Sequence, residues 1–414
     1  MLELSTLVSL IKKHHADIQS VSANARHALP HRGTNTLFVG LPSVDMRSIL
    51  KNQIDALINE GHTWDEILYI DFEDAAFLDF ETADLQRLLR AYAALHPNHI
   101  PIGVFFNSSC IPGWATFIRR IANRHFTVYL ATCDDVTQDP DIVTTLGGRL
   151  FIQPIWPLGF REWGESEWRN KGLGNNGDPI NERLSVDDYL KYGLQNAMVT
   201  KDLDTCLREL AARHGLHDSL GLKHLVNTLT KGVGHPTSLT HLAQVLNQSV
   251  HDNENTVIKY VNTLLRARVL LMVPNFNDAI TGLTTPPKYY VGDHVFLNGL
   301  SSDAQFAQIE HLVVHELLRQ LGTDHAVFFL KSESTDLDFY VPELSFGIVL
   351  ALEAQSDATL TQAIKTFENA HQSVSCQRRQ ILTLGLAKKL ECPFGQIDVI
   401  PLWKWLLTFG DNAF

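Results

Sequence analysis

A glycine followed at fixed spacing by acidic, thioether and basic side chains lies early in the chain, in the stretch FVGLPSVDMRSILKNQI. Loops of the form G-x-x-x-x-G-K-[ST] bind nucleotide phosphates. Glycine lets backbone N–H groups surround the phosphates, lysine reaches the β and γ oxygens, and the hydroxyl holds Mg²⁺. With Gly40 in the first position, the later key positions fall on Asp45, Met46 and Arg47, and Ser48 follows one step on. The spacing therefore predicts a degenerate phosphate loop.

These replacements oppose nucleotide binding. A carboxylate ~4 Å from a phosphate charge repels it by roughly 4 kcal/mol at an effective dielectric near 20, which is about three orders of magnitude in affinity. Met46 carries no charge, and the guanidinium of Arg47 cannot hold Mg²⁺. We therefore expect no cofactor. The weaker alternatives are Mg²⁺ and an ATP or ADP held by Arg47 and Ser48 without hydrolysis.

Hydrolysis also needs a carboxylate at the end of a second strand to coordinate Mg²⁺, and another to activate water. After the apolar run IPIGVFF, the chain has Asn107 and Ser108 in these places. The run YIDFEDAAF does carry Asp71, Glu73 and Asp74, but helix caps and loop charges are the commoner role of such acids. The chain thus lacks both the second glycine, the lysine and the hydroxyl of the phosphate loop and the carboxylates expected after the second strand. We therefore expect that it does not hydrolyse ATP.

Five apolar runs could hold these residues in place: TLFVGL, EILYIDFED, IPIGVFFN, HFTVYLATC and GRLFIQPIW. They alternate with helical patterns between residues 36 and 156, as strands buried on both faces of a parallel sheet do. We expect an α/β fold with a five-stranded, doubly wound, P-loop NTPase-like sheet. Further on, two amphipathic helices lead into a strand-like run, the order of a winged helix-turn-helix. A third α/β region follows the paired prolines of TTPPKYYVGDH.

Composition limits the functional classes. The 414 residues carry a formal net charge of −12 and five scattered cysteines with no C-x-x-C pair. General attraction to a phosphate backbone, a disulfide framework and a zinc knuckle are therefore not predicted. No signal peptide or run of ~20 apolar residues is recognisable, so we expect a cytoplasmic protein with no membrane partner.

The two missing motifs invite comparison with a family. The chain resembles prokaryotic AAA-type ATP-binding proteins, which join a P-loop domain to a winged helix and a C-terminal restriction-endonuclease-like domain of unknown function. The matching landmarks are Gly40, Val44, Ser48, Leu50 and Lys51 in the loop, Pro112-Gly113-Trp114, Arg119-Arg120, Arg149, Arg161 and Glu162, and the stretches KYYVGDH and VIPLWKWL. The resemblance implies an AAA scaffold whose Walker A and Walker B chemistry is lost. The expected regions are an N-terminal helix (1–35), the P-loop-like domain (36–160), a helical connection (161–231), the winged helix (232–292) and the endonuclease-like domain (293–414).

The resemblance also implies a PD-(D/E)xK-like C-terminal domain, in which an Asp and a Glu hold Mg²⁺ and a lysine positions water. Glu310 and Glu316 fit the family's helix, and Asp338 fits its first strand. In the second strand, either Glu353 and Gln355 or, with a shift of one residue, Leu352 and Ala354 take the places of the acid and the lysine, so no lysine stands there in either register. We therefore expect Glu310, Asp338 and Glu353 to be vestigial, with no metal site. A metal-dependent nuclease with a vestigial ATPase domain is the alternative.

Two further patterns have a functional interpretation. His311 and His315 are spaced i, i+4 on one helix face, as zinc ligands can be, but no third ligand follows at a recognisable spacing. The second winged-helix helix could contact DNA through Lys259, Arg266 and Arg268, although acids lead its first turn, so packing between domains is favoured. We expect a catalytically inactive pseudo-ATPase that binds or scaffolds an unidentified protein partner.

Overall fold

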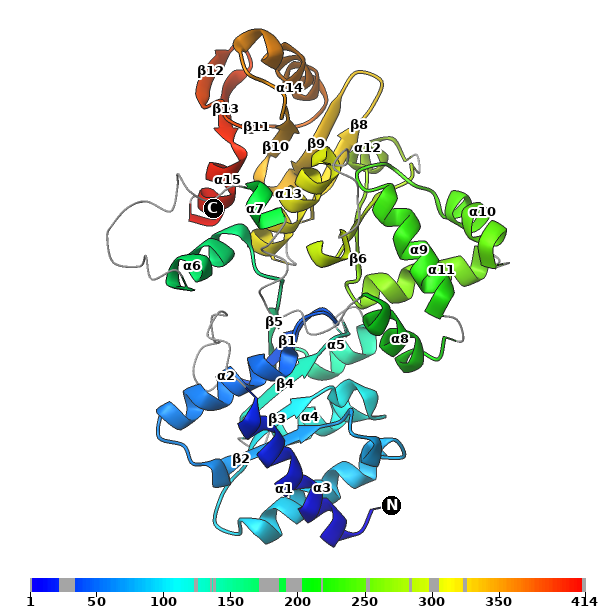
Figure 1. Cartoon of the computed structure of the whole chain (residues 1–414), viewed down its shortest axis with the longest axis vertical. Coiled ribbons are helices and arrows are strands. Elements are labelled where there is room, and N and C mark those ends of the chain that lie inside the picture. The colour runs from blue at the N-terminus through cyan, green and yellow to red at the C-terminus, as the bar shows by residue number, and fades with distance from the viewer. Residues whose placement is uncertain are drawn as a thin grey trace. The chain divides into compact units, whose positions relative to one another are not determined.

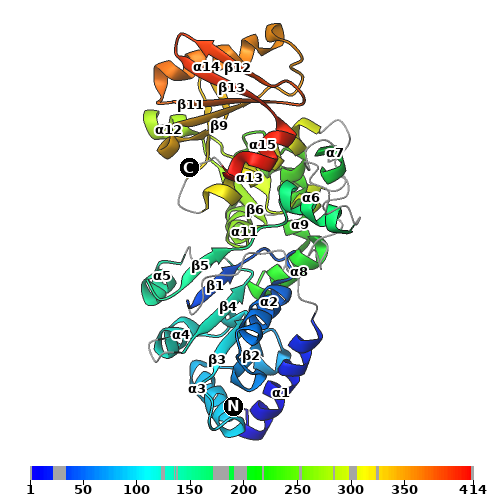
Figure 2. The same ribbon diagram turned by 90° about the vertical axis from the view of Figure 1, so that its left-hand side faces the viewer.

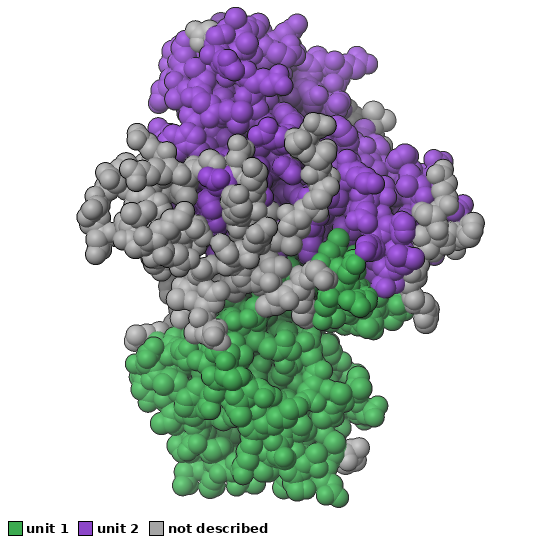
Figure 3. All heavy atoms as spheres, in the orientation of Figure 1, with its two compact units in different colours: residues 1–156, 198–216, 266–268 green, residues 157–197, 217–265, 269–414 purple. Residues whose placement is uncertain are grey.

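The computed structural model describes residues 2–21, 34–122, 126–134, 136, 139–170, 186–190, 203–216, 219–250, 254–282, 285–297, 305–322 and 326–411. Two compact units divide the chain. Unit 1 consists of residues 1–156, 198–216 and 266–268, and unit 2 of residues 157–197, 217–265 and 269–414 (Figure 3). No described helix has the combination of length and apolar character that crossing a membrane requires.

Unit 1 contains a five-stranded parallel sheet with the order β2-β3-β4-β1-β5. The strands are β1 (Thr36–Val39), β2 (Ile67–Asp71), β3 (Ile102–Phe106), β4 (Val128–Thr132) and β5 (Phe151–Pro154). Each lies within one of the five predicted apolar runs. The prediction of a five-stranded parallel α/β sheet is confirmed.

Helices cover both faces of this sheet, which explains why the strands are apolar throughout. The helices of unit 1 are α1 (Leu4–Ser20), α2 (Met46–Asn59), α3 (Thr82–Leu95), α4 (Trp114–Ala122), α5 (Pro140–Leu146) and α8 (Leu203–Arg213). Alternate strand residues enter two apolar clusters, one shared with α2 and the other with α3 and α4. Figure 2 shows α2 on one side of the strands and α4 and α5 on the other.

Helix α1 is part of unit 1, packed against β2 and α3 (Figure 1). The ring of His14 is buried. Its Nδ1 accepts a hydrogen bond from the backbone N–H of Asp71 at 3.3 Å, and its Nε2 lies 3.2 Å from Asp74 Oδ2. His15 Nε2 donates to the carbonyl of Ile67 at 2.6 Å. Although these histidines follow the charged pair Lys12-Lys13, they do not lie on a solvated helix face, because both bond the backbone of the edge strand β2.

The first part of unit 2 is mostly helical. Its elements are α6 (Phe160–Asn170), α7 (Val186–Asp188), α9 (Ser219–Lys231), α10 (Leu239–Val250), α11 (Glu254–Arg266), β6 (Leu270–Val273), α12 (Phe276–Thr281) and β7 (Lys288–Val291). Strands β6 and β7 pair antiparallel. Two consecutive helices followed by a two-stranded sheet match the predicted order of elements, and the winged-helix assignment stays a prediction.

The rest of unit 2 is built on a six-stranded mixed sheet with the order β12-β13-β11-β10-β9-β8. The strands are β8 (Phe328–Lys331), β9 (Asp336–Val341), β10 (Phe346–Leu350), β11 (Arg378–Thr383), β12 (Lys388–Cys392) and β13 (Gly395–Pro401), and the helices are α13 (Gln305–Leu321), α14 (Thr361–Ser373) and α15 (Leu402–Thr408). This part is α/β as predicted, and its assignment to the PD-(D/E)xK class stays a prediction.

Candidate functional site

Backbone N–H groups of the loop between β1 and α2 donate hydrogen bonds to carbonyl groups of the protein. The N–H of Gly40 donates to the carbonyl of Thr132 at 2.9 Å, that of Val44 to Leu41 at 3.0 Å, and that of Met46 to Val44 at 2.9 Å. A phosphate loop works by turning such N–H groups toward the ligand. In this loop, the N–H groups of Gly40, Val44 and Met46 are instead hydrogen-bonded to protein carbonyls.

Asp45 and Met46 occupy the space that a phosphate would need. The carboxylate of Asp45 caps α2, accepting from the Ser48 N–H at 3.3 Å and from the Ser48 hydroxyl at 2.5 Å. An anion at a helix N-terminus satisfies the N–H groups and the helix dipole that bind phosphate elsewhere. Met46 is buried against Gly40, where a Cβ would lie 2.2 Å from the Met46 sulfur. The sequence shows which residues stand at these two positions, but it could not show their contacts with Ser48 and Gly40.

Arg47 points to the carboxyl ends of β2 and β3. Its Nε donates to Asp71 at 2.8 Å and its second nitrogen to Glu73 at 2.9 Å, while the guanidinium lies 4.5 Å from the centre of the Phe106 ring. Burial by itself lowers the pKa of Arg47, but the two carboxylates outweigh burial and raise it. Arg47 is therefore a permanent cation already paired with two anions.

Glu73 is the centre of a larger polar network at the carboxyl ends of β2 and β3. Its Oε1 accepts from Asn107 Nδ2 at 2.5 Å and from Arg213, at the end of α8, at 3.1 Å. Asn107 adopts a left-handed backbone (φ 49°), and its Oδ1 accepts from the N–H of Cys133 at 3.3 Å. Ser108 is buried beside it. The predicted Walker B positions thus join β3, β4 and Glu73 through hydrogen bonds.

A second carboxylate completes this network. Asp134 follows β4 and is contacted by Arg213 at 3.4 Å and by His214 at 3.3 Å. Burial by itself raises the pKa of Asp134, but the hydrogen bond from His214 and the charge of Arg213 lower it overall. Nothing in the sequence signalled Arg213, because it lies 140 residues from Glu73 along the chain.

A cleft of about 370 Å³ lies beside this network, between α1 and the end of β2. Its charged lining includes Lys13, Arg47, Asp71, Glu73 and Asp74. The ammonium of Lys13 lies 2.6 Å from Asp74, and Arg47 is paired as described. Both cations in the cleft are thus neutralised by protein carboxylates, which opposes binding of a polyanion.

In unit 2, the candidate endonuclease residues differ in burial: Glu310 is buried, Asp338 is partly buried and Glu353 is exposed. Glu310, on α13, accepts from Lys288 Nζ and from the Tyr290 hydroxyl, both at 2.8 Å. Asp338, on β9, accepts from the N–H of Leu350 at 2.7 Å. Burial raises the pKa of Asp338 to about 7, and the charge of Glu310 adds to this effect. Lys288, on β7, lies outside the strand in which the resemblance would place a lysine, and the sequence did not point to its contact with Glu310.

Glu353 does not join Glu310 and Asp338. It lies after β10 with its side chain exposed, while Leu352 and Ala354 on either side are buried. Among the described residues, Glu310, Asp338 and Glu353 do not form a group of potential ligands close enough to share a metal. Burial of a paired Glu310 and of a protonatable Asp338 fits structural carboxylates better than a magnesium site.

The basic residues of the candidate DNA-binding region also differ in exposure to solvent. Lys259 and Arg266 are exposed on α11, whereas Arg268 is buried in unit 1 with its guanidinium 5.6 Å from the centre of the Trp156 ring. Glu254, in the first turn, accepts from the Thr240 hydroxyl at 3.2 Å. Two exposed cations that follow an acidic first turn provide little positive charge for binding a DNA duplex.

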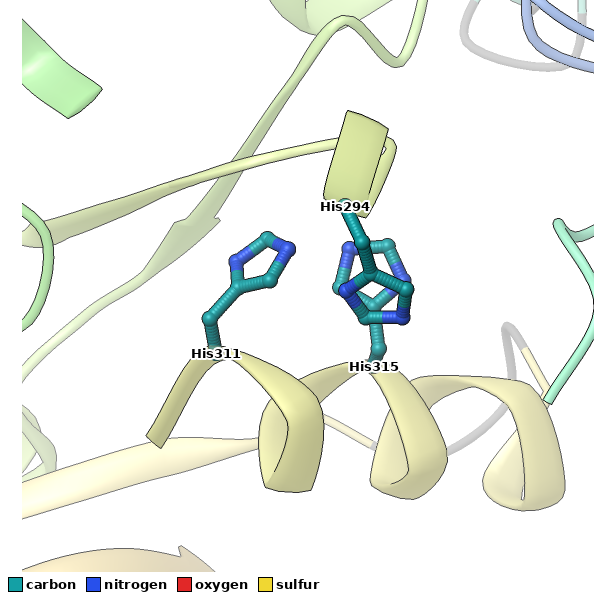
Figure 4. A group of neighbouring side chains, drawn as sticks. All are labelled: His294, His311 and His315. Carbon is teal, nitrogen blue, oxygen red and sulfur yellow. The ribbon is translucent and has the colours of Figure 1, made fainter. Parts of the chain in front are cut away.

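The structure brings a third histidine to the predicted pair. His294 lies beside His311 and His315, and one ring nitrogen from each residue lies within 4.8 Å of the others (Figure 4). All three side chains are buried. The sequence did not reveal His294, because it lies in a turn after β7, outside the helix that carries the pair.

Several family-like landmarks support the fold. Gly113 has φ +72°, and a Cβ there would lie 2.2 Å from the Thr82 hydroxyl, which donates to the Pro112 carbonyl at 2.6 Å. Glu162 accepts from the N–H of Gly159 at 3.0 Å and pairs with Arg319 at 2.8 Å. These landmarks hold turns and helix ends in place.

No known protein-family profile matches the chain. The chain is 22% identical over 379 residues to the uncharacterized protein MJ1544 of Methanocaldococcus jannaschii, covering 85% of this chain and 84% of that protein. Similar solved structures include Orc1 of Aeropyrum pernix in complex with DNA (12% identity, 77% of this chain and 95% of that one, TM-score 0.27) and the Walker-type ATPase PABY2304 of Pyrococcus abyssi (12%, 72% and 95%, 0.36).

Proposed function

We propose that this protein is a pseudo-ATPase: an AAA-derived, P-loop-like domain that does not hydrolyse ATP and acts as a binding or scaffolding component. The observation that carries this proposal is the closure of the phosphate loop by its own side chains. Asp45 caps the helix where a phosphate would bind, Met46 covers Gly40, and Arg47 is committed to Asp71 and Glu73. A bound triphosphate would have to displace all of these contacts.

The polar network at the strand ends supports the same proposal. In a hydrolase, carboxylates at this edge coordinate Mg²⁺ and activate water. Here Asp71, Glu73 and Asp134 are neutralised by Arg47 and Arg213. The network therefore ties α2, α8 and the strand ends together, and unit 1 serves as a stable body for binding.

The edge strand β5 offers a surface for a protein partner. Phe151 and Ile152 are 50% and 42% exposed, and Val143 on α5 is 47% exposed. An apolar cavity of about 180 Å³ adjoins them, lined by Ile142 and Leu146 among others. An exposed apolar strand at a sheet edge can pair with another chain. The partner we propose is a protein that adds an extended segment to β5 in the cytoplasm.

The test is ATP turnover by the purified chain with Mg²⁺, compared with the Arg47→Ala variant. The proposal expects no phosphate release above the blank from either protein. Turnover by the wild type that disappears in Arg47→Ala would overturn it, whereas equal turnover by both would identify a contaminating ATPase. Mg²⁺- or Mn²⁺-dependent DNA cleavage that disappears in Asp338→Ala would instead favour the nuclease alternative.

A further inference from the structure

Three buried histidines converge in unit 2. His294 opens the turn η7 (His294–Leu297) after β7, and His311 and His315 lie one turn apart on the same face of α13. The ring centroids are 4.9 Å apart for His294 and His311, 4.5 Å for His294 and His315, and 4.4 Å for His311 and His315. Figure 4 shows the ring of His294 directed toward the two rings on the helix.

Three ring nitrogens of His294 and His311 have no hydrogen-bond partner. Nδ1 and Nε2 of His311 and Nδ1 of His294 are buried without any hydrogen bond. Nearly all buried polar atoms in proteins have a partner, and those without one call for an explanation such as an unobserved ion. Ring stacking alone does not satisfy these atoms, because a nitrogen lone pair or N–H in an apolar setting loses its hydration.

A hydrogen bond to the backbone fixes the ring of His315. Its Nε2 donates to the carbonyl of Val291 at 2.8 Å, so in the neutral ring Nδ1 carries the lone pair. Metal-bound histidines commonly donate their other ring N–H to a backbone carbonyl in this way. Burial lowers the pKa of His315 to about 4, and it also lowers the pKa values of His294 and His311. Metal ions bind the neutral form of an imidazole ring.

We propose that His294, His311 and His315 bind one divalent transition-metal ion, with zinc as the first candidate. Imidazole nitrogens suit zinc and its neighbours, whereas Mg²⁺ and Ca²⁺ prefer oxygen ligands. With Zn–N distances of about 2.0–2.1 Å, tetrahedral ligands lie ~3.3 Å apart, so the nitrogens must close by at most about 1.5 Å through side-chain rotation. The fourth position falls to a water molecule. The ion would fasten the turn after β7 to α13 as a structural clamp.

The first test is metal uptake by the full-length chain. Protein stripped with a strong chelator is titrated with Zn²⁺ against a weaker chromophoric chelator. We expect one zinc per chain in the wild type and in the control His371→Leu, which removes an exposed histidine of unit 2. The variants His294→Leu and His311→Leu should lose this equivalent. No uptake by the wild type, or equal uptake by His311→Leu, would overturn the proposal.

Melting temperatures of the wild type and of His311→Leu, measured with and without zinc, test the site independently of metal uptake. Without metal, His311→Leu should melt at the wild-type temperature or above it, because two unsatisfied nitrogens are removed. Zinc at a hundredfold excess over its dissociation constant should raise the melting temperature of the wild type by roughly 5–10 °C and leave that of the variant unchanged. Equal shifts in both proteins would contradict the site.

X-ray absorption of the zinc-loaded wild type needs no variant and decides the question even if the substitutions prevent folding. The proposal predicts a nitrogen shell at about 2.0–2.1 Å with imidazole scattering. A sulfur shell, or loss of the metal on gel filtration, would refute it.

Discussion

The partly buried carboxyl of Asp338 should make the protein less stable as the pH rises. Its folded pKa is about 7, against an ordinary value of 3.8, because burial disfavours the charged form. Between these two values the folded state binds more protons than the unfolded state. The contribution to the free energy of unfolding is therefore full below about pH 4, falls as the pH rises toward 7, and is level above it.

The magnitude follows from the size of the shift. About three pKa units correspond to about 4 kcal/mol in total, of which about 2–3 kcal/mol is lost between pH 5 and pH 8. Asp338→Asn removes the titration while its amide oxygen can still accept the N–H of Leu350. The measurement is urea unfolding at pH 5 and pH 8 for the wild type, Asp338→Asn and the control Asp336→Asn.

Asp336 makes a suitable control because it lies on the same strand with its side chain 63% exposed. The control should keep the wild-type loss of stability between the two pH values, and the loss for Asp338→Asn should be smaller by about 2–3 kcal/mol. If Asp338→Asn and the wild type change equally with pH, the carboxyl is not held neutral by burial and this reasoning is wrong.

Three further predictions concern contacts in the two units. Glu310→Gln should lower the free energy of unfolding by about 3–5 kcal/mol in urea titrations, because it leaves the buried ammonium of Lys288 without an anion; a loss below 1 kcal/mol would contradict the buried pair. Arg47→Ala should cost about 1–2 kcal/mol, since this half-exposed guanidinium holds two carboxylates; unchanged stability would mean that solvent screens the network. Gly113→Ala should lower the melting temperature by several degrees through its positive φ and the Thr82 contact, whereas Gly385→Ala, which meets no atom within 4 Å, should leave it nearly unchanged.

Local sequence patterns predicted the strands of the parallel sheet well, because burial on both faces of the sheet constrains the residue type at each position. Strands buried on both faces must be apolar throughout, and the runs around Phe38, Tyr69 and Phe105 show this directly. The alternation of exposed Glu353 with buried Leu352 and Ala354 is also a local feature, but its register could not be fixed from the sequence.

The contacts within the candidate sites were beyond the reach of the sequence. Arg213 meets Glu73 across 140 residues, and Lys288 meets Glu310 from a different strand. His294 joins the helical histidines only because β7 ends beside α13. Such pairings depend on tertiary packing, which residue spacing does not encode when the partners lie on separate elements.

The measurement that tests the central proposal most directly is a thermal melt of the purified chain with ATP or ADP at millimolar concentration, each with and without Mg²⁺. A nucleotide at a hundredfold excess over its dissociation constant would raise the melting temperature of unit 1 by roughly 5–10 °C. The closed loop at Asp45, Met46 and Arg47 predicts no shift. A clear rise that is lost in Arg47→Ala would mean that the altered loop still holds a nucleotide, and the proposal of a closed phosphate site would be wrong.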